Sequence, residues 1–349
     1  MADRTSFLKS SLAALLSLAL SAPLVQAQPA DKPTSTATDP APRPLSEEVK
    51  AVLPSIVTVK STVPREARSA RSLGTEREGQ GVVIDAEGLV LTVGYLVLEA
   101  SGVEIVDNGG RHASALIVAF DNDSGFALVR TVVPLKVKPV AFGNSDMLKQ
   151  RDSVVIAGAG GADKAVHGLV ADRRQFAGYW EYLLDNAIFT VPPYRNWGGA
   201  ALLDEQGALM GIGSLQVPDA YRGGHVYPGN MFIPINRLKP IFETMKAGHR
   251  PAGSRPWIGV TTREARGRLI IASVQPGSPA ESAGLRRGDV VRSVGGTEVD
   301  SLADFYNSLW ATGPIGTIVT LGIDRGGERV DVPVRSGDRY KYLRLDSSL

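Results

Sequence analysis

The sequence contains no Cys, which excludes a cysteine nucleophile, so a candidate triad would be built from Ser, His and Asp. Its four His residues are His112, His167, His225 and His249. A Ser hydroxyl becomes a nucleophile when a His takes its proton and an Asp holds the imidazole in the right tautomer. None of the first three His residues has a recognisable Ser and Asp partner pattern, and His249 lies in a polar stretch. The lack of thiols also excludes disulfides and thiolate metal sites.

The composition is typical of a folded protein with substantial cores. Of the 349 residues, 43% are hydrophobic and 21% are charged, which is an ordinary globular balance. At roughly 150 residues per domain, this length predicts two domains with extra segments. The formal net charge of +2 gives no strong attraction to nucleic acid or to anionic membranes. We therefore expect no nucleic-acid partner, and we expect no metal or other cofactor.

The first 27 residues have the pattern of a cleaved export signal. Arg4 and Lys9 supply a positive start, and residues 12–20 form a short apolar stretch. Residues 25–27 suit a signal peptidase, so we expect cleavage after Ala27 and a periplasmic protein without stable membrane insertion. The alternative is a membrane anchor, but this stretch is shorter than the roughly 20 residues that a spanning helix needs.

Short strands dominate the sequence after residues 28–45, a Pro- and Thr-rich segment that we interpret as a flexible linker. Turns at residues 85–88 and 108–110 join pairs of apolar runs, as in β-hairpins. Strands are predicted at residues 82–84, 89–91, 103–106, 115–119, 126–131, 153–157, 200–203 and 209–212, and helices at residues 46–53, 236–247 and 301–311. Many short strands with Gly-rich turns predict a mainly β protein of the barrel or sandwich type.

Several strings in the first part of the chain resemble the HtrA/DegP family of trypsin-like serine proteases. They are residues 79–97 (GQGVVIDAEGLVLTVGYLV), residues 142–146 (FGNSD), and residues 196–202 (NWGGAAL) followed by Gly211 and Ile212. The resemblance implies a trypsin-like double β-barrel over residues 46–248. Members of this family are usually trimers, so it also implies a homotrimer or a mixed oligomer with active relatives. Residues 28–50 would supply part of that contact.

The resemblance breaks down at the three catalytic positions. The His position falls on Tyr95, the Asp position on Gly125 and the Ser position on Trp197. A phenol with a pKa near 10 is a poor base, glycine has no side chain, and indole has no nucleophilic oxygen. The oxyanion loop is altered too, because Arg195 stands in place of a Gly, next to Asn196. We expect no catalytic residue and no protease activity, since losing Ser or His alone typically lowers turnover about 10⁶-fold.

Two questions about this degenerate site stay open at the level of sequence. Shifting the alignment by one or two residues would offer Asp123 or Ser124 for the Asp position, but it would not restore both His and Ser. Tyr95 and Trp197 either fill an unused cleft, which is the usual fate of large aromatics, or form an aromatic wall that binds an apolar segment of a partner.

Residues 256–336 resemble a PDZ domain, a β-sandwich-like barrel with two helices, which leaves residues 337–349 as a C-terminal tail. The resemblance is closest at residues 274–291 (VQPGSPAESAGLRRGDVV). Upstream of this string, the loop that binds a terminal carboxylate through backbone N–H groups falls on Trp257, Ile258, Gly259 and Val260. The helix at residues 301–311 would line the groove with Phe305 and Leu309. The alternative is a domain that only packs against the barrel.

These features together predict an exported HtrA-like pseudoprotease. Its PDZ groove would bind C-terminal or extended segments of envelope proteins, and the protein would act as a scaffold, a chaperone-like binder or an adaptor. The rival hypothesis is a serine-type endopeptidase of envelope protein quality control that uses non-standard residues. A third is a purely structural assembly component. A cluster of basic residues, Arg65, Arg68, Arg71 and Arg77, is either solvated or in contact with an acidic partner.

Overall fold

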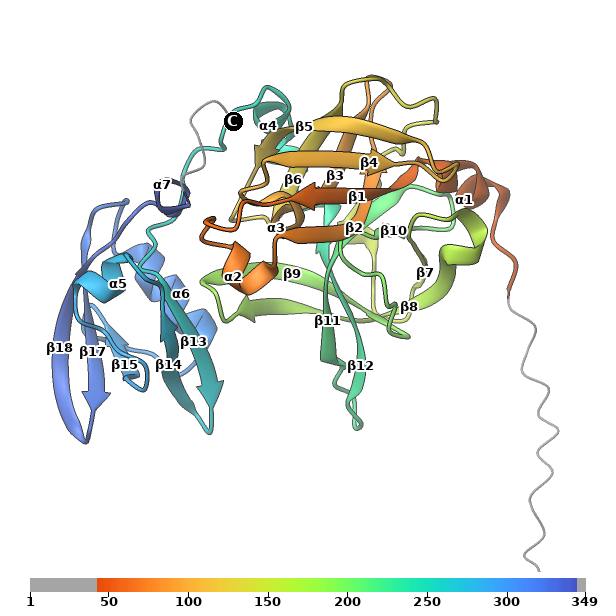
Figure 1. Ribbon diagram of the computed structural model, residues 1–349. Helices are drawn as coiled ribbons and strands as arrows, with labels where there is room; N and C mark the ends of the chain where they lie inside the picture. The colour runs from red at the N-terminus through yellow and green to blue at the C-terminus, as the bar shows by residue number, and fades with distance from the viewer. Residues whose placement is uncertain (1–42, 344–349) are drawn as a thin grey trace, which may run out of the picture. The chain divides into compact units, whose positions relative to one another are not determined.

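The computed structural model describes residues 43–343, and their strands form two closed barrels and one open sheet (Figure 1). This arrangement confirms the mainly β fold predicted from the sequence, a double barrel followed by a smaller C-terminal domain. The predicted export signal and most of the predicted linker lie outside the described residues. No helix within residues 43–343 has the length and apolar character needed to cross a membrane.

The first barrel joins six antiparallel strands in the order β1-β2-β3-β6-β5-β4. Their bounds are β1 Ile56–Thr62, β2 Glu76–Val83, β3 Leu89–Val93, β4 Gly102–Val106, β5 His112–Phe120 and β6 Phe126–Thr131. The two predicted hairpins are β2–β3 and β4–β5. The first turn forms because the Asp85 carboxylate accepts the N–H groups of Glu87 and Leu89, at 2.9 and 2.8 Å.

The second barrel follows the order β10-β11-β12-β9-β8-β7. Its strands are β7 Ser153–Ala157, β8 Ala165–Gly178, β9 Tyr182–Val191, β10 Ala201–Leu203, β11 Leu209–Tyr221 and β12 Tyr227–Pro234. The sequence did not predict β8, β9 and β12. Polar residues 172–175 interrupt the apolar pattern of β8, where the pairing with β9 changes register. The β8–β9 hairpin ends in a short turn between Gly178 and Tyr182.

The C-terminal domain is a sheet in the order β13-β14-β15-β17-β18, with β16 paired to β15. Its elements are β13 Val260–Ala265, β14 Arg268–Val274, α5 Pro279–Ser282, β15 Val290–Val294, β16 Thr297–Glu298, α6 Leu302–Ala311, β17 Ile318–Arg325 and β18 Glu328–Arg335. The hydroxyl of Ser301 caps α6 by accepting the N–H of Asp304 at 3.1 Å. The helix predicted at residues 301–311 is therefore confirmed, with Ser301 as its cap.

The remaining helices are short. They are α1 Glu47–Val52, α2 Ala70–Leu73, α3 Gly94–Val97, α4 Phe242–Lys246 and α7 Arg339–Tyr342. The single helix predicted at residues 236–247 is wrong: two 3₁₀ turns precede α4, and Pro240 lies in the second of them. Proline has no N–H to donate and disfavours a helical residue before it, so a continuous α-helix cannot pass this point.

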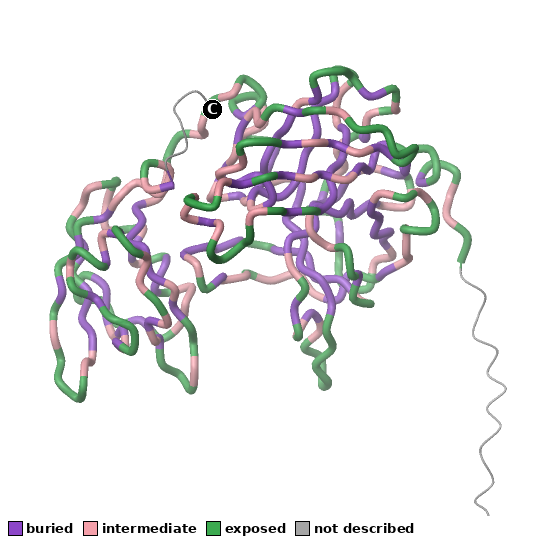
Figure 2. The backbone as a smooth tube through the Cα atoms, viewed as in Figure 1, coloured by how far each residue is buried: buried purple, intermediate pink, exposed green. Residues whose placement is uncertain are grey.

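Buried residues occur throughout both barrels and in the C-terminal domain (Figure 2). The buried apolar side chains of the barrels and of the C-terminal domain form separate clusters. The barrel cluster includes Ile56, Leu91, Phe126 and Ile212, all fully buried. The C-terminal cluster holds Ile258, Phe305 and Leu309 and also takes in Leu183, which belongs to β9 of the second barrel. The apolar packing thus continues from the β8–β9 hairpin into the C-terminal domain.

Candidate functional site

The three residues at the expected catalytic positions lie together. Tyr95, Gly125 and Trp197 all line one cavity of about 430 Å³. They reach it from different elements: Tyr95 is in α3, Gly125 lies just before β6, and Trp197 is in the loop before β10. Leu215 of β11 also lines the cavity. The fold therefore brings the three expected catalytic positions together around one cavity.

Tyr95 is held as a hydrogen-bond donor. Its hydroxyl donates to the carbonyl oxygen of Ser214 at 3.0 Å. Burial raises the pKa of the Tyr95 hydroxyl well above its usual value, and a side-chain hydrogen bond with Trp197 opposes this only in part. The phenol is therefore neutral at physiological pH, and a neutral phenol is a much weaker base than an imidazole.

Gly125 ends a tight turn and has room for little else. Its backbone has φ +84°, in the left-handed region, and its carbonyl accepts the N–H of Gly94 at 2.7 Å. A Cβ atom at this position would lie 3.1 Å from both Ile233 Cδ1 and the hydroxyl of Tyr182. An Asp side chain here would meet backbone strain and crowding together.

The loop that carries Trp197 is fixed by its backbone. The Trp197 carbonyl accepts the N–H of Ala200 at 3.0 Å, and a Cβ at Gly213 would approach that carbonyl to 2.0 Å. Arg195 and Asn196 are exposed and do not line the cavity. The side chains in the expected oxyanion loop thus point to solvent, while the indole of Trp197 faces the cavity.

The cavity of Tyr95 and Trp197 also lacks the side-chain types of a Ser-His-Asp triad beyond Ser among its described lining residues. Within residues 43–343, no His lines the cavity of Tyr95, and no cluster of three or more His, Asp or Glu could hold a metal. Asp123 faces a different, smaller pocket beside Arg255, whose Nε lies 3.8 Å from its carboxylate. Ser124 is buried, and its carbonyl accepts the Tyr182 hydroxyl at 2.9 Å. Neither alternative for the Asp position completes a triad.

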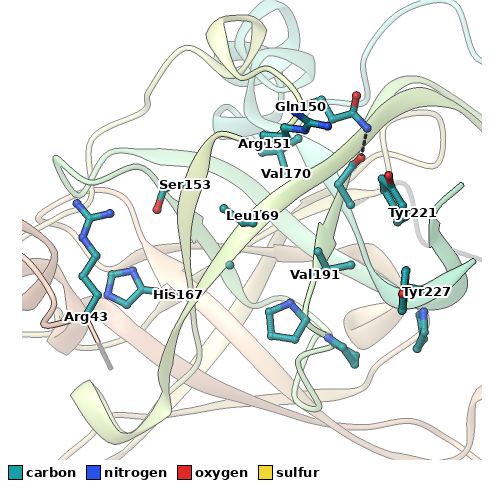
Figure 3. Close-up of a pocket in the computed structure, with 15 residues that line it drawn as sticks. Arg43, Gln150, Arg151, Ser153, His167, Leu169, Val170, Val191, Tyr221 and Tyr227 are labelled. Atoms are coloured by element: carbon teal, nitrogen blue, oxygen red, sulfur yellow. Dashed lines mark hydrogen bonds between the residues drawn. The ribbon is translucent and has the colours of Figure 1, made fainter. Parts of the chain in front are cut away.

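A second cavity, of about 780 Å³, lies on the second barrel and is largely apolar (Figure 3). Leu169, Val191, Tyr221 and Tyr227 line it, and Arg43 stands at one side. Leu169 and Tyr227 are 48% and 53% exposed, so this apolar surface faces solvent. His167 also lines it, which places this His away from the cavity of Tyr95 and Trp197.

The predicted carboxylate-binding loop adopts a conformation in which its N–H groups converge. The backbone N–H groups of Ile258, Gly259 and Val260 all donate to the carboxylate of Glu181, at 3.1, 2.7 and 2.9 Å. Gly259 has φ +88°, and a Cβ there would lie 2.3 Å from the Cβ of Ser278. Glycine is needed at this position both for its backbone conformation and for the close approach of the α5 cap.

The side chains that were predicted to line the groove are buried next to this loop. Phe305 and Leu309 of α6 are fully buried and pack in one cluster with Ile258 and Leu183. Trp257 is also buried, and its backbone pairs with that of Gly337 at 3.1 and 2.7 Å. Part of the predicted tail, residues 337–343, is therefore attached to the start of the loop.

Sequence reasoning missed Glu181, whose carboxylate occupies the loop. It lies 77 to 79 residues before its three donors, in a short turn whose sequence (GYWEY) matches no binding motif. A contact of this separation has no periodicity that could reveal it. The only signal in the sequence is an acidic residue among aromatics, which by itself indicates no partner.

The four arginines of the basic cluster have different environments in the structure. Arg77 is buried, and its guanidinium donates to the carbonyls of Tyr95 and Leu98, both at 2.8 Å. Arg68 donates to the carbonyl of Pro276 at 2.8 Å and stacks on the ring of Tyr342, 4.0 Å from its centroid. Only Arg65 and Arg71 are exposed. The interpretation of four solvated arginines is therefore wrong for Arg77, because its charge fixes the backbone around the Tyr95 helix.

Two domain families match the chain. Residues 79–212 match the trypsin-like peptidase domain, and residues 256–335 match the PDZ domain. The first match contains Tyr95, Gly125 and Trp197, and the second contains the loop that binds Glu181.

Curated proteins similar to this chain include periplasmic proteases at modest identity. The periplasmic pH-dependent serine endoprotease DegQ of Escherichia coli is 29% identical over 329 residues, which cover 85% of this chain and 71% of DegQ. The periplasmic serine endoprotease DegP of the same organism is 29% identical over 268 residues, which cover 73% of this chain and 56% of DegP. The chain thus spans little more than half the length of DegP.

Solved structures support the fold. A serine endoprotease from Yersinia pestis matches with a TM-score of 0.50 and 20% identity, over 84% of this chain and 98% of that one. The HtrA-type protease AlgW with a decapeptide matches with a TM-score of 0.50 and 19% identity, over 83% of this chain and 97% of that one. The chain therefore contains a trypsin-like peptidase domain followed by a PDZ domain, and its fold is similar to that of these proteases.

Proposed function

We propose that this protein is a periplasmic HtrA-like pseudoprotease that binds polypeptide segments through its PDZ domain and does not cut them. The observation that carries the proposal is the contrast between its two sites. The PDZ loop presents converging N–H groups to a carboxylate, whereas the protease cavity is lined by Tyr95, Gly125 and Trp197. The proposed partners are C-terminal or extended segments of envelope proteins.

The PDZ loop supports binding because it meets the chemical needs of a terminal carboxylate. Three backbone N–H groups can donate hydrogen bonds to both carboxylate oxygens without a charged side chain. The adjacent strand β13 offers its edge to an extended peptide. The apolar side chains of Ile258, Phe305 and Leu309 lie beside the loop and suit an apolar last residue. Burying one such side chain contributes about 1.5–3 kcal/mol before ordering costs, so single tails should bind at about micromolar strength.

The cavity supports the proposal of a non-catalytic protein, because none of the residues at the three catalytic positions can do the chemistry of the group it replaces. Tyr95 stays protonated, Gly125 has no side chain and a left-handed backbone that an Asp tolerates poorly, and Trp197 carries no nucleophilic oxygen. The backbone donors of an oxyanion hole are useful only when a nucleophile is present to create the oxyanion.

A second candidate is a serine-type endopeptidase that uses non-standard residues, and the names of the relatives favour it. DegQ and DegP are both called periplasmic serine endoproteases. This candidate requires an activated Ser elsewhere in the chain. A fluorophosphonate probe labels only an activated Ser, so labelling of the purified protein would support this candidate and its absence would support the pseudoprotease.

Calorimetry with synthetic peptides tests the binding function. Peptides that end in Val or Leu with a free carboxylate should bind, and their C-terminal amides should bind at least about tenfold more weakly, because each lost charge-assisted hydrogen bond is worth roughly 1.5–3 kcal/mol. Changing the peptide is a cleaner test than Gly259→Glu, because a side chain at position 259 would collide with Ser278 and disturb the domain. If amidated or Asp-ended peptides bind equally well, the groove does not recognise C-terminal tails.

A further inference from the structure

The turn of the β8–β9 hairpin lies in the PDZ groove. Glu181 in this turn is buried, and its carboxylate accepts all three N–H groups of the loop at residues 258–260. Oε1 accepts from Gly259 and Val260, and Oε2 accepts from Ile258. Both oxygens are engaged, as the two oxygens of a peptide's terminal carboxylate would be.

Backbone contacts place the rest of the turn in the manner of a bound peptide. The N–H of Thr262, in β13, donates to the carbonyl of Tyr179 at 2.9 Å. Tyr179 precedes Glu181 by two residues in the same turn, where Glu181 has a left-handed backbone with φ +56°. The turn therefore adds a short backbone segment to the edge of β13 while Glu181 fills the carboxylate loop.

The helix on the other side of the groove holds the same turn. The hydroxyl of Tyr306, in α6, donates to the carbonyl of Gly178 at 2.7 Å and accepts the N–H of Glu181 at 3.3 Å. Tyr306 is fully buried. Leu183 of β9 packs into the apolar cluster that includes Ile258, Phe305 and Leu309. An anion, a strand-edge contact and an apolar side chain thus all come from the protein's own hairpin.

Burial on balance disfavours the charged form of Glu181, and the loop supplies most of the groups that favour it. Burial raises the pKa of this carboxyl group, and the N–H donors of Val260, Ile258 and Gly259 oppose that rise, as does the nearby charge of Arg339. Arg339 is tied to the same turn, since its guanidinium donates to the carbonyl of Trp180 at 3.4 Å. A buried carboxylate needs such donors, so their loss would release the turn rather than leave Glu181 unpaired.

We propose that Glu181 is an internal ligand that caps the PDZ groove, and that an incoming polypeptide with a free α-carboxylate and an apolar last residue must displace it. This inference rests on the proposed tail-binding function and adds a closed state to it. A tail that binds only the open state has its apparent affinity reduced by the open fraction.

The same turn also lines the protease cavity. Trp180 and Tyr182, on either side of Glu181, line the cavity of Tyr95 and Trp197, and their rings stack with centroids 5.6 Å apart. The Tyr182 hydroxyl is bonded to the carbonyl of Ser124 at 2.9 Å. The turn that caps the groove therefore also forms part of the wall of this cavity.

The test compares the Glu181→Ala variant with the unaltered protein and with the Asp185→Asn variant. Asp185 is an exposed carboxylate on the same hairpin, bonded to Gln175 at 2.7 Å, so its loss changes the charge without touching the groove. Calorimetry uses a peptide ending in Leu with a free carboxylate, and its amide. Glu181→Ala should bind the free acid at least about tenfold more tightly than the other two proteins, as expected when the closed state is populated at 90% or more. The amide should gain little.

Hydrogen exchange over residues 256–262 separates failure of the cap from failure of tail binding. Without peptide, the backbone amides of this segment should exchange faster in the Glu181→Ala variant than in the unaltered protein or in the Asp185→Asn variant. Equal exchange and equal peptide affinity in all three would overturn the cap while leaving tail binding intact. Faster exchange with no peptide binding in any protein would keep the cap and reject the proposed tail-binding function.

Tyr306→Phe keeps the test decisive if Glu181→Ala does not fold. This variant removes only the hydroxyl that holds the carbonyl of Gly178 and the N–H of Glu181. It should raise affinity for the free acid and speed exchange at residues 256–262, by less than Glu181→Ala. A Tyr306→Phe protein indistinguishable from the unaltered chain in both measurements would overturn the cap.

Discussion

At the scale of single residues, the protease cavity differs from an active triad site in more than the three replaced side chains. Tyr95 and Trp197 line this cavity of about 430 Å³ and leave it open, so the interpretation that they simply fill an unused cleft is incomplete. The aromatic wall that could bind an apolar segment remains a hypothesis. Gly125 adds a backbone in the left-handed region, which an Asp tolerates poorly.

Restoring the three side chains should therefore not restore catalysis. We expect the triple variant Tyr95→His, Gly125→Asp, Trp197→Ser to remain unlabelled by a fluorophosphonate, because the new Asp would be strained and crowded by Ile233 and Tyr182. Arg195 and the prolines at 192 and 193 also leave the oxyanion loop unlike that of an active enzyme. Intact mass spectrometry measures the label, and stoichiometric labelling of the triple variant would show that the scaffold is still competent.

Site residues could be predicted from the sequence where they belong to a local sequence motif. The loop at residues 257–260 and the helix residues Phe305 and Leu309 were found because turn glycines and an i, i+4 apolar pair are local signals. Glu181 was not, because its partners are set by tertiary packing between two domains. The interpretation of Arg77 as solvated was wrong for a related reason. A charged residue is expected to be exposed unless the fold supplies buried acceptors for it, and that cannot be seen in the sequence.

At the scale of elements, prediction succeeded for short strands next to tight turns and failed for long or interrupted ones. The β2–β3 hairpin has a capped polar turn, whereas β8 and β9 contain polar residues and register changes that hide the strand pattern. The turn between β5 and β6 is one element whose chemistry the sequence could not show. It holds Asp123 in a partly buried position facing Arg255.

This turn predicts a pH-dependent stability. Burial raises the pKa of Asp123 to about 6, the charge of Asp121 adds to the rise, and Arg255 opposes it. An acid with a raised folded-state pKa stabilises the fold fully at low pH and loses that contribution as pH rises through the folded value. The melting temperature of the unaltered protein should thus fall relative to Asp123→Asn between about pH 4 and pH 6.5. Parallel curves for the two proteins across that range would contradict this assignment.

At the scale of the whole molecule, the sequence and the fold point to assembly through the barrels. The predicted contact includes residues 28–50, and Arg43 from this range lines the apolar cavity with Leu169 and Tyr227. Arg43 is fixed there by an ion pair with Glu205 at 2.8 Å. An exposed apolar surface of this kind is typical of a protein interface.

Light scattering at micromolar concentration should find a trimer. The double variant Leu169→Asp, Tyr227→Asp should shift the mass downward, because it places charges on the apolar surface. Val133→Asp is the matched control, since Val133 is 67% exposed but lies outside this cavity. A protein that is only a monomer of about 34 kDa, the mass expected after signal removal, would reject the trimer.

The central claim, that this protein binds polypeptides without cutting them, is tested most directly by incubating it with unfolded casein and following the casein by intact mass spectrometry. The account predicts that casein stays intact over a day at equimolar protein, and that Trp197→Ala gives the same result. Casein fragments that accumulate in proportion to the protein, and that persist in Trp197→Ala, would contradict the account and establish an endopeptidase with chemistry outside the degenerate triad.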